Sequence, residues 1–175
     1  SRKQEISVKL PIMLSVIDEF PDYQFVVGGA PSVPDEFYAK VIAGRAALVR
    51  NRTYGLLHFA HAALVTSGTA TLETGLFGVP LVVCYKGGAI SYQIAKRLVK
   101  VDYISLVNLV MEREVAKELI QADLTKQNLV AELQQIVGSG AKRKQMLDDL
   151  KALQERLGGS GASAITAKLM LKTLI

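Results

Sequence analysis

The stretch ALVTSGTATLE, residues 63–73, carries the pattern that decides the fold. Residues 62–66 are an apolar run without alternation, which is typical of a strand covered on both faces. Residues 70–77 follow as an expected helix, and a turn containing Gly68 separates the two. A buried strand that passes through a short turn into a helix is the repeating unit of a parallel α/β sheet.

The same unit recurs on both sides of this stretch. Short apolar runs predict strands at residues 23–30, 46–50, 62–66 and 80–85. Helices are expected at residues 1–17, 34–42, 54–60, 70–77 and 89–100. Because the connections are too short for anything but parallel crossovers, the sequence predicts a doubly wound, mostly parallel, Rossmann-like sheet. The opening helix resembles the second half of a strand–turn–helix unit, so we expect a fragment whose first strand is absent.

The pattern changes in the last third of the chain. From residue 112 onward only helices are expected, at residues 112–121, 126–137, 141–157 and 163–175. The Gly-Gly-Ser-Gly run at 158–161 is a flexible hinge by composition. The sequence therefore predicts one domain over residues 1–157, and a hinge with a final helix over residues 158–175.

Composition excludes several classes of protein. The chain has 175 residues, half of them hydrophobic, and a net charge of +5, which suits an anionic partner without requiring one. Low aromatic content and the absence of Trp argue against a nucleic-acid-binding module. The single cysteine, Cys84, excludes an internal disulfide and indicates a reducing compartment. His58 and His61 lack partners at metal-ligand spacing, so we expect packing or surface roles and no metal site.

Ser67, Gly68 and Thr69 stand where a parallel sheet binds ligands, at the carboxyl end of a strand and the start of a helix. Two hydroxyls, a glycine turn and the positive end of the helix together favour a phosphate site. The alternative is that Thr69 only caps the helix.

Glu73 lies one turn inside that helix. It is four residues after Thr69, whereas a capping box requires three. We therefore expect its carboxylate to accept hydrogen bonds from the hydroxyls of a ribose, while the phosphate takes the helix amides. The alternative is a solvated glutamate that the helix dipole favours.

Three segments of the chain resemble the lipid A disaccharide synthase family. They are SGTATLE (67–73), GVPLVVCYK (78–86) and AKRLVKVDYISLVN (95–108). The resemblance covers nearly the whole chain and places it in the carboxyl-terminal, UDP-binding half of a two-domain GT-B type glycosyltransferase of Gram-negative bacteria. It implies transfer of 2,3-diacylglucosamine from its UDP derivative to 2,3-diacylglucosamine 1-phosphate, with release of UDP and inversion of the anomeric centre.

The resemblance also implies roles for individual residues. Arg2 would stabilise the leaving diphosphate, Ser67, Gly68 and Thr69 would face it, and Glu73 would hold the ribose. Two further positions, Lys86 and Asn108, would contact the diphosphate or the donor sugar. A solvated lysine and a plain turn residue remain the alternatives for these two. The resemblance implies no cofactor or metal. It places the general base in the absent amino-terminal domain, so the chain alone should bind UDP without catalysing the transfer.

Partners follow from the same resemblance. Both substrates are acylated, so we expect a cytoplasmic enzyme peripheral to the inner membrane. Lys96, Arg97 and Lys100 beside an apolar stripe could contact anionic lipid, although a solvated face explains them as well. The last helix is expected to pack on the missing amino-terminal domain or to exchange with a second copy in a dimer.

Two other functions remain open from the sequence. Another GT-B enzyme, such as a UDP-sugar epimerase or a different glycosyltransferase, would share residues 67–73 but lack the run at 96–108. A non-catalytic regulatory module of flavodoxin-like shape would bind an anion or a partner protein. Such a module would be indifferent to Glu73→Ala.

Overall fold

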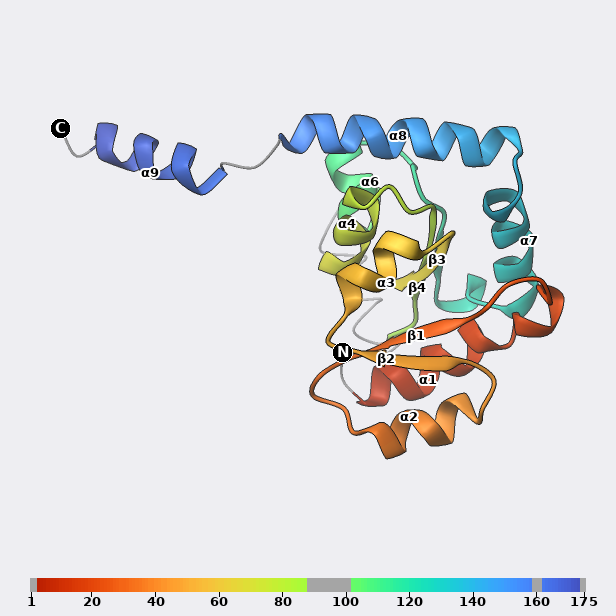
Figure 1. Cartoon of the computed structure of the whole chain (residues 1–175). Helices are drawn as coiled ribbons and strands as arrows, with labels where there is room; N and C mark the ends of the chain where they lie inside the picture. Colours follow the sequence, from red (N-terminus) through yellow and green to blue (C-terminus); the bar gives the residue numbers. More distant parts are fainter. Residues whose placement is uncertain (1–2, 88–101, 159–161, 174–175) are drawn as a thin grey trace.

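The computed structural model describes residues 3–87, 102–158 and 162–173 (Figure 1). Strands and helices alternate through the first half, which confirms the four expected strands and their intervening helices. The elements are α1 (Lys3–Leu14), β1 (Val26–Gly29), α2 (Asp35–Ile42), β2 (Ala47–Arg50), α3 (Thr53–Phe59), β3 (Ala63–Thr66), α4 (Thr69–Leu76) and β4 (Leu81–Tyr85). The helix expected at residues 89–100 lies outside the described residues.

The second half differs from the expectation of helices alone. Its elements are α6 (Leu106–Met111), β5 (Glu118–Ile120), α7 (Lys126–Val137), α8 (Ala141–Leu157) and α9 (Ala162–Thr173). The helix expected at 112–121 was wrong, because Glu112 takes a left-handed conformation with φ 56° and ends α6, and β5 follows. Helices α7 and α8 are confirmed with the expected bounds. Helix α9 begins one residue before its expected start, and the last two residues of its expected range lie outside the described part of the chain.

All strand pairs are parallel, as expected, but they form two sheets in the described part of the chain. β1 pairs with β2, and β3, β4 and β5 form a separate sheet in that order. The α/β class with carboxyl-terminal helices is confirmed, whereas one continuous sheet is not found. Thr66 at the end of β3 pairs with Cys84 in β4, so the carboxyl ends of these strands lie at one edge.

Each sheet has its own hydrophobic core. In the smaller one, Ile6, Leu10 and Leu14 of α1 pack with residues of α2 and the loop before it. The larger core surrounds β4, whose residues Leu81 to Cys84 are at most 1% exposed. Helices α4, α6 and α8 pack together over this sheet. Gly75 permits their close approach, because a Cβ there would lie 2.9 Å from Leu153 Cδ2 and 3.1 Å from Val107 Cγ2.

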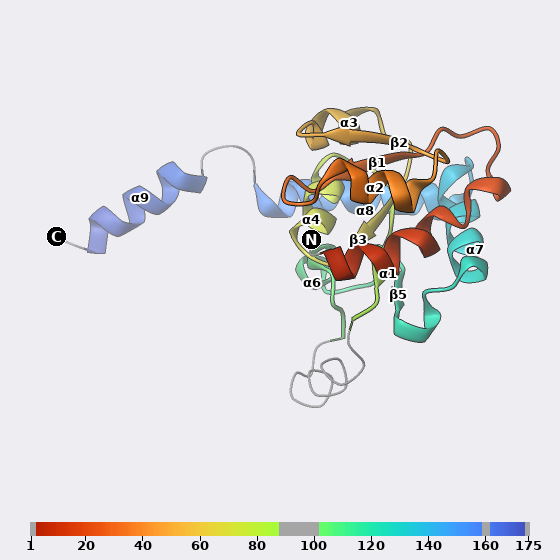
Figure 2. The same ribbon diagram turned by 90° about the horizontal axis from the view of Figure 1, so that it is seen from below.

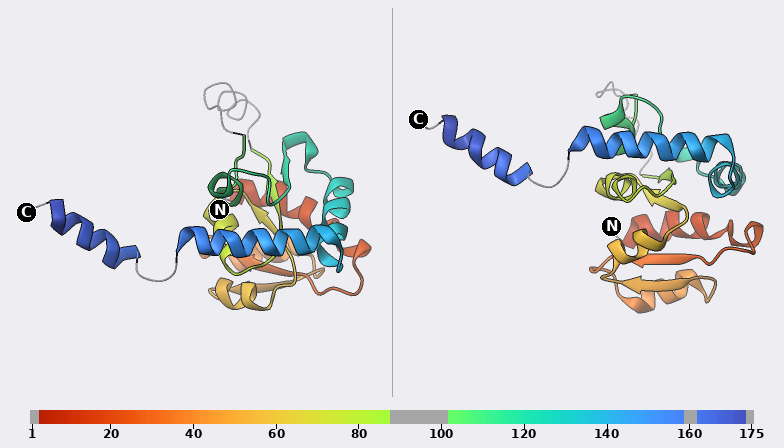
Figure 3. Two further views of the ribbon diagram at one scale, coloured as in Figure 1. Left: turned by 90° about the horizontal axis from the view of Figure 1, so that it is seen from above. Right: turned by 45° about the horizontal axis from the view of Figure 1, so that its top comes forward.

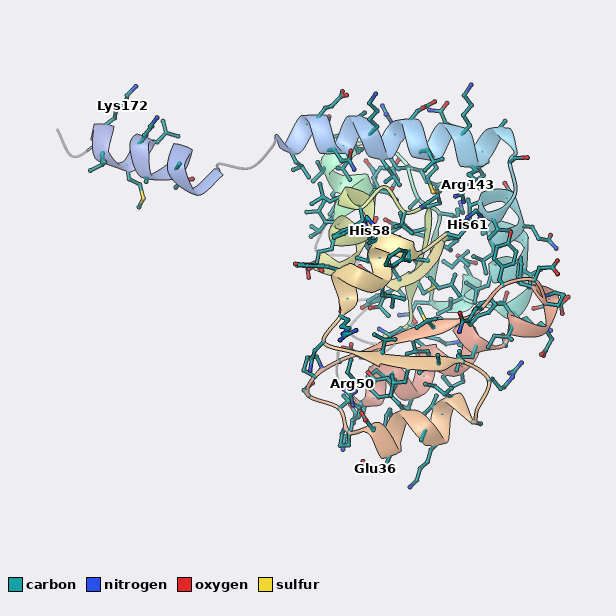
Figure 4. The ribbon with its side chains drawn as sticks, in the orientation of Figure 1. Glu36, Arg50, His58, His61, Arg143 and Lys172 are labelled. Carbon is teal, nitrogen blue, oxygen red and sulfur yellow. The ribbon has the colours of Figure 1, made fainter. Side chains whose placement is uncertain are left out.

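His61 joins the segment before β3 to the end of α7. Its Nε2 lies 2.7 Å from the carbonyl oxygen of Val137, and Arg143 on α8 donates to the His61 carbonyl at 3.1 Å. Figure 4 shows the side chains of His61 and Arg143 near each other, on the side of the body where α7 lies. His61 is exposed and joins two segments, and the ring of His58 packs edge-on against Phe59, so both fit the expected packing or surface roles.

Helix α8 runs across one side of the body, and α9 extends beyond it (Figures 1 and 2). Figure 3 shows α9 clear of the strands from two further directions. Three of its apolar side chains are about 60% exposed, namely Leu169, Met170 and Leu171. The helix expected after the Gly-rich hinge is therefore present. Its expected partner stays a prediction.

Candidate nucleotide site

The expected phosphate-binding residues lie at the carboxyl edge of the three-stranded sheet. Ser67, Gly68 and Thr69 directly follow β3, and Lys86 directly follows β4. Because Thr66 and Cys84 are register partners on these adjacent strands, the turn and Lys86 leave the sheet side by side. Lys86 is half-buried, and no ion pair of its ammonium occurs among the described residues. A cation is thus available close to the turn.

Gly68 shapes the turn between β3 and α4. Its φ of 146° and ψ of −165° lie in a region that L side chains rarely adopt, so glycine is required here. Gly68 is also the N-cap of α4, and no side chain caps the helix. Thr69 is the first helical residue and is exposed. The alternative in which Thr69 caps the helix is therefore wrong.

The start of α4 has amide groups available for an anion. No hydrogen bond to the backbone N–H of Thr69 or Ala70 occurs within the described part of the chain, as expected for the first turn of a helix. Thr71 uses its hydroxyl locally, donating to the Gly68 carbonyl at 2.8 Å. These amides and the positive end of the helix dipole can stabilise a phosphate.

Ser67 uses its hydroxyl within the protein. Its Oγ donates a hydrogen bond of 2.9 Å to the carbonyl oxygen of Ile104, which lies 37 residues further along the chain. The hydroxyl oxygen can still accept a hydrogen bond, but its proton is committed. Ser67 therefore holds the turn in place and does not offer a free donor to a ligand.

Glu73 lies one turn further along α4, on the wall of a cavity of about 730 Å³. The residue is half-buried, and Thr53, Ala70 and Thr74 also line the cavity. Its carboxylate makes no hydrogen bond or ion pair with any described residue. Neither of its oxygens is among the buried unpaired side-chain atoms of the described residues, so both are open to water or to a ligand. The position on the cavity wall leaves both oxygens able to accept hydrogen bonds from a ligand, and the ribose contact stays a prediction.

Asn108 has a structural role. Its side chain is fully buried, its amide donates to the Ala116 carbonyl at 2.8 Å and to Glu118 Oε1 at 2.9 Å, and its Oδ1 accepts from the amides of Val115 and Ala116. All its usual hydrogen-bonding capacity is used inside the fold. In this structure the side chain is committed to the turn between α6 and β5, and the expected contact with the donor stays a prediction.

Glu118 was missed from the sequence, where it fell in an expected helix. In the structure Glu118 is the first residue of β5, and its carboxylate accepts hydrogen bonds from the segment that leads into α6. Its Oε2 accepts from Ile104 N at 2.9 Å, and its Oε1 accepts from the amide and the hydroxyl of Ser105 at 2.9 and 2.7 Å. Since Ser67 bonds to the same Ile104, Glu118 supports the turn after β3 indirectly. No sequence signal marks it, because the contact depends on a strand of three residues.

Arg2 lies outside the described residues, as do Lys96, Arg97 and Lys100. Among the residues described, no group of three or more His, Cys, Asp or Glu side chains could hold a metal ion. In the same part of the chain, no helix has the length and apolar character needed to cross a membrane.

Cys84 lies on β4 beneath the turn and has no exposed surface. Burial raises the pKa of its thiol to about 12, although the Lys9 ammonium and a backbone hydrogen bond to Val65 act in the opposite direction. The thiol therefore stays protonated at neutral pH and behaves as a small hydrophobic side chain, as expected.

Known proteins match this chain along nearly its full length. A family model described as lipid-A-disaccharide synthetase matches residues 1–169. Lipid-A-disaccharide synthase of Syntrophus aciditrophicus is 40% identical over 184 residues, which cover 100% of this chain and 48% of that protein. Those of Geobacter sulfurreducens and Acidobacterium capsulatum are 33% and 35% identical, over 99% and 94% of this chain and 47% and 46% of their own lengths.

The chain thus spans about half the length of the curated relatives it matches. The family match covers both the turn after β3 and the network around Asn108. It also covers the residues on which the sequence resemblance rests. The chain belongs to the lipid-A-disaccharide synthetase family.

Proposed function

We propose that this chain is the donor-binding half of a glycosyltransferase that moves 2,3-diacylglucosamine from its UDP derivative to 2,3-diacylglucosamine 1-phosphate. Membership of the family supports the reaction class. The single observation that carries the site is Glu73, whose carboxylate lies on the cavity wall one turn behind the Gly68 turn and has no hydrogen-bond or ion-pair partner among the described residues. In the proposal its two oxygens accept hydrogen bonds from the hydroxyls of the UDP ribose.

The diphosphate binds at the start of α4 in this proposal. The amides of Thr69 and Ala70 donate to its oxygens, and the helix dipole and Lys86 add positive potential. Arg2, carried over from the family pattern, would add a bidentate guanidinium. Ser67 acts by fixing the turn through Ile104.

The chemistry is electrostatic. Negative charge grows on the departing diphosphate as the glycosidic bond breaks, and fixed amides and cations stabilise that charge more strongly than they stabilise the bound donor. The general base that activates the acceptor hydroxyl is assigned to the half of the protein outside this chain. The isolated chain is therefore expected to bind UDP without transferring the sugar.

The acylated substrates place the complete enzyme at a membrane surface in this proposal, on the cytoplasmic side of the inner membrane. The exposed apolar residues of α9 support a further contact, either with the other half of the enzyme or with a second copy. A regulatory module that binds only an anion is disfavoured, since an anion site has no use for the unpaired Glu73.

The experiment is a transfer assay on the full-length protein, with Glu73→Ala compared with Glu155→Ala. Glu155 is exposed on α8, so it is a control for loss of one negative charge. The proposal predicts a KM for the UDP donor at least ten times higher in Glu73→Ala and unchanged in Glu155→Ala, because about 1.4 kcal/mol of binding is lost. Equal KM values in the two variants would reject this role for Glu73.

A further inference from the structure

Arg50, the last residue of β2, holds the loop between β1 and α2. Its Nη1 donates to the carbonyl oxygen of Ala30 at 2.5 Å, and its Nη2 donates to the carbonyl oxygen of Val33. Its Nε donates to Asp35 Oδ1 at 2.7 Å, and Nη2 donates to the same oxygen. Figure 4 shows Arg50 on the side of the body where Glu36 marks the start of α2. One guanidinium therefore binds this loop at three points between Ala30 and Asp35.

Tyr38 supports the same loop from α2. Its hydroxyl oxygen accepts from the Ala30 amide at 2.8 Å, and the residue is only 2% exposed. The Arg50 guanidinium carbon lies over the Tyr38 ring, 5.1 Å from its centroid, where a cation is attracted to the face of the ring. Protein side chains thus bind both backbone polar groups of Ala30, so the loop is held without a ligand.

Gly29 leaves the space in which the Arg50 side chain reaches this loop. Gly29 is the register partner of Arg50 and is buried. A Cβ at Gly29 would lie 2.9 Å from Arg50 Cδ and 3.1 Å from Arg50 Nε, which is closer than packed side chains normally approach. A side chain at residue 29 would therefore displace the guanidinium from its partners.

The end of β1 and the start of this loop line the cavity on whose wall Glu73 lies. Gly28, Gly29, Ala30 and Pro31 contribute to that wall. None of these four residues carries a polar side chain, so a ligand meets backbone and small apolar groups there. Such a wall favours a ligand through its shape, and its effect depends on where the wall is held.

We infer that Arg50 is a positioning residue for the donor nucleotide, because it holds the segment from Gly28 to Pro31 as one wall of the nucleotide site. The inference rests on the proposed function, since it concerns the same site as Glu73. Arg50 acts through this segment and does not itself bind the nucleotide. A wall that is fixed in advance loses less conformational entropy on binding than one that the ligand must order.

Loss of Arg50 should therefore weaken the complex with the nucleotide. The segment from Gly28 to Pro31 takes no part in breaking the glycosidic bond, so its contribution is the same for the bound donor and the transition state. A loss of such uniform binding raises KM and leaves kcat unchanged.

The test measures sugar transfer and UDP affinity in the full-length protein, for Arg50→Ala, Arg50→Lys and Arg45→Ala. Arg45 lies before β2 and forms an exposed ion pair of 2.7 Å with Asp18, so Arg45→Ala is a matched control that also loses an arginine–aspartate pair. Lysine at residue 50 keeps the charge but lacks the planar fork that binds two carbonyl groups and a carboxylate at once. Urea unfolding shows whether each variant is folded.

The inference predicts that both Arg50 variants raise the KM for the UDP donor and the dissociation constant of UDP by about fivefold or more, with kcat changed by less than about twofold. Arg45→Ala should behave as the natural protein. Unchanged UDP affinity in Arg50→Ala, or an equal loss in Arg45→Ala, would overturn the inference. Full affinity in Arg50→Lys would also overturn it, because charge alone would then suffice.

If Arg50→Ala does not fold, Arg50→Lys decides in the same way, and failure of both to fold would reject a positioning role in favour of a purely structural one. Glu73→Ala separates this inference from the proposed function. If Glu73→Ala loses UDP affinity and the Arg50 variants keep it, only the role of Arg50 is rejected. If Glu73→Ala keeps affinity and the Arg50 variants lose it, the ribose contact is rejected and the role of Arg50 stands.

Discussion

Ser67 Oγ donates a 2.9 Å hydrogen bond to the carbonyl oxygen of Ile104, and this contact joins the turn after β3 to the segment before α6. The amide of the same Ile104 donates to Glu118 Oε2 at 2.9 Å. One residue therefore connects the proposed phosphate site to a carboxylate at the start of β5. The site depends on contacts between segments that are far apart in sequence.

Replacing Ser67 with alanine removes the hydrogen bond and leaves the Ile104 carbonyl without it. We expect unfolding free energy to fall by about 1 kcal/mol, the usual net value of one hydrogen bond. Ser7→Ala is the control, because the Ser7 hydroxyl bonds locally to Gln4 on an exposed helix face. Urea unfolding measures both variants, and equal loss in the two would contradict the connecting role of Ser67.

Asn108→Ala should cost far more stability. It removes four hydrogen bonds at a fully buried site and leaves the amides of Val115 and Ala116 without acceptors. We expect a loss of about 3 kcal/mol or more, since unsatisfied buried groups carry their full desolvation cost. Asn128→Ala, at an exposed first turn of α7, should cost about 1 kcal/mol or less. A small loss in Asn108→Ala, combined with a large loss of UDP affinity, would favour the ligand role.

Gly68→Ala tests the turn itself. A Cβ at Gly68 has no atom within 4 Å, so the whole effect comes from the backbone, whose φ of 146° disfavours alanine. We expect a loss of about 1–3 kcal/mol in unfolding free energy. Gly55 in α3 also has open space around it and no positive φ, so Gly55→Ala should gain about 0.5–1 kcal/mol. Thermal unfolding of the pair checks the sign of each change.

The buried thiol of Cys84 should lower the free energy of unfolding at alkaline pH. The folded state holds the thiol pKa at about 12, above the ordinary value of 9.0, so the unfolded state loses the proton first as the pH rises. The contribution of Cys84 is complete below pH 9 and declines between pH 9 and about 12, by up to about 1.4 kcal/mol per pH unit. Cys84→Ser should remove this slope from the pH dependence of urea unfolding. An unchanged slope would contradict the burial of the thiol.

Much of the fold was predictable from local pattern. Apolar runs bounded by Gly and Pro located β1 to β4, and helical periodicity located α7 and α8. The structure of the segment from Leu106 to Ile120 was not predictable in this way. Helix α6 has six residues and strand β5 has three, which are too few to show a helical or strand periodicity in the sequence. The end of α6 depends on Glu112 in a left-handed conformation, which its residue type does not indicate.

The candidate site was predictable in part. The order of a strand, a glycine turn and a helix located Gly68, and the spacing to Glu73 excluded a capping box. The commitments of Ser67 and Asn108 were hidden, because their partners Ile104, Ala116 and Glu118 come from the segment whose structure was missed. Residue type gave the hydrogen-bonding capacity, and only the fold shows where it is used.

The most direct test of the account is a calorimetric cycle on the full-length protein. UDP and 2′-deoxy-UDP are each titrated into the natural protein and into Glu73→Ala. If Glu73 binds the ribose, either change alone should weaken binding about tenfold, or about 1.4 kcal/mol, and the two together should weaken it little further. Fully additive losses, or UDP binding that is unchanged in Glu73→Ala, would contradict the assignment of this carboxylate to the donor.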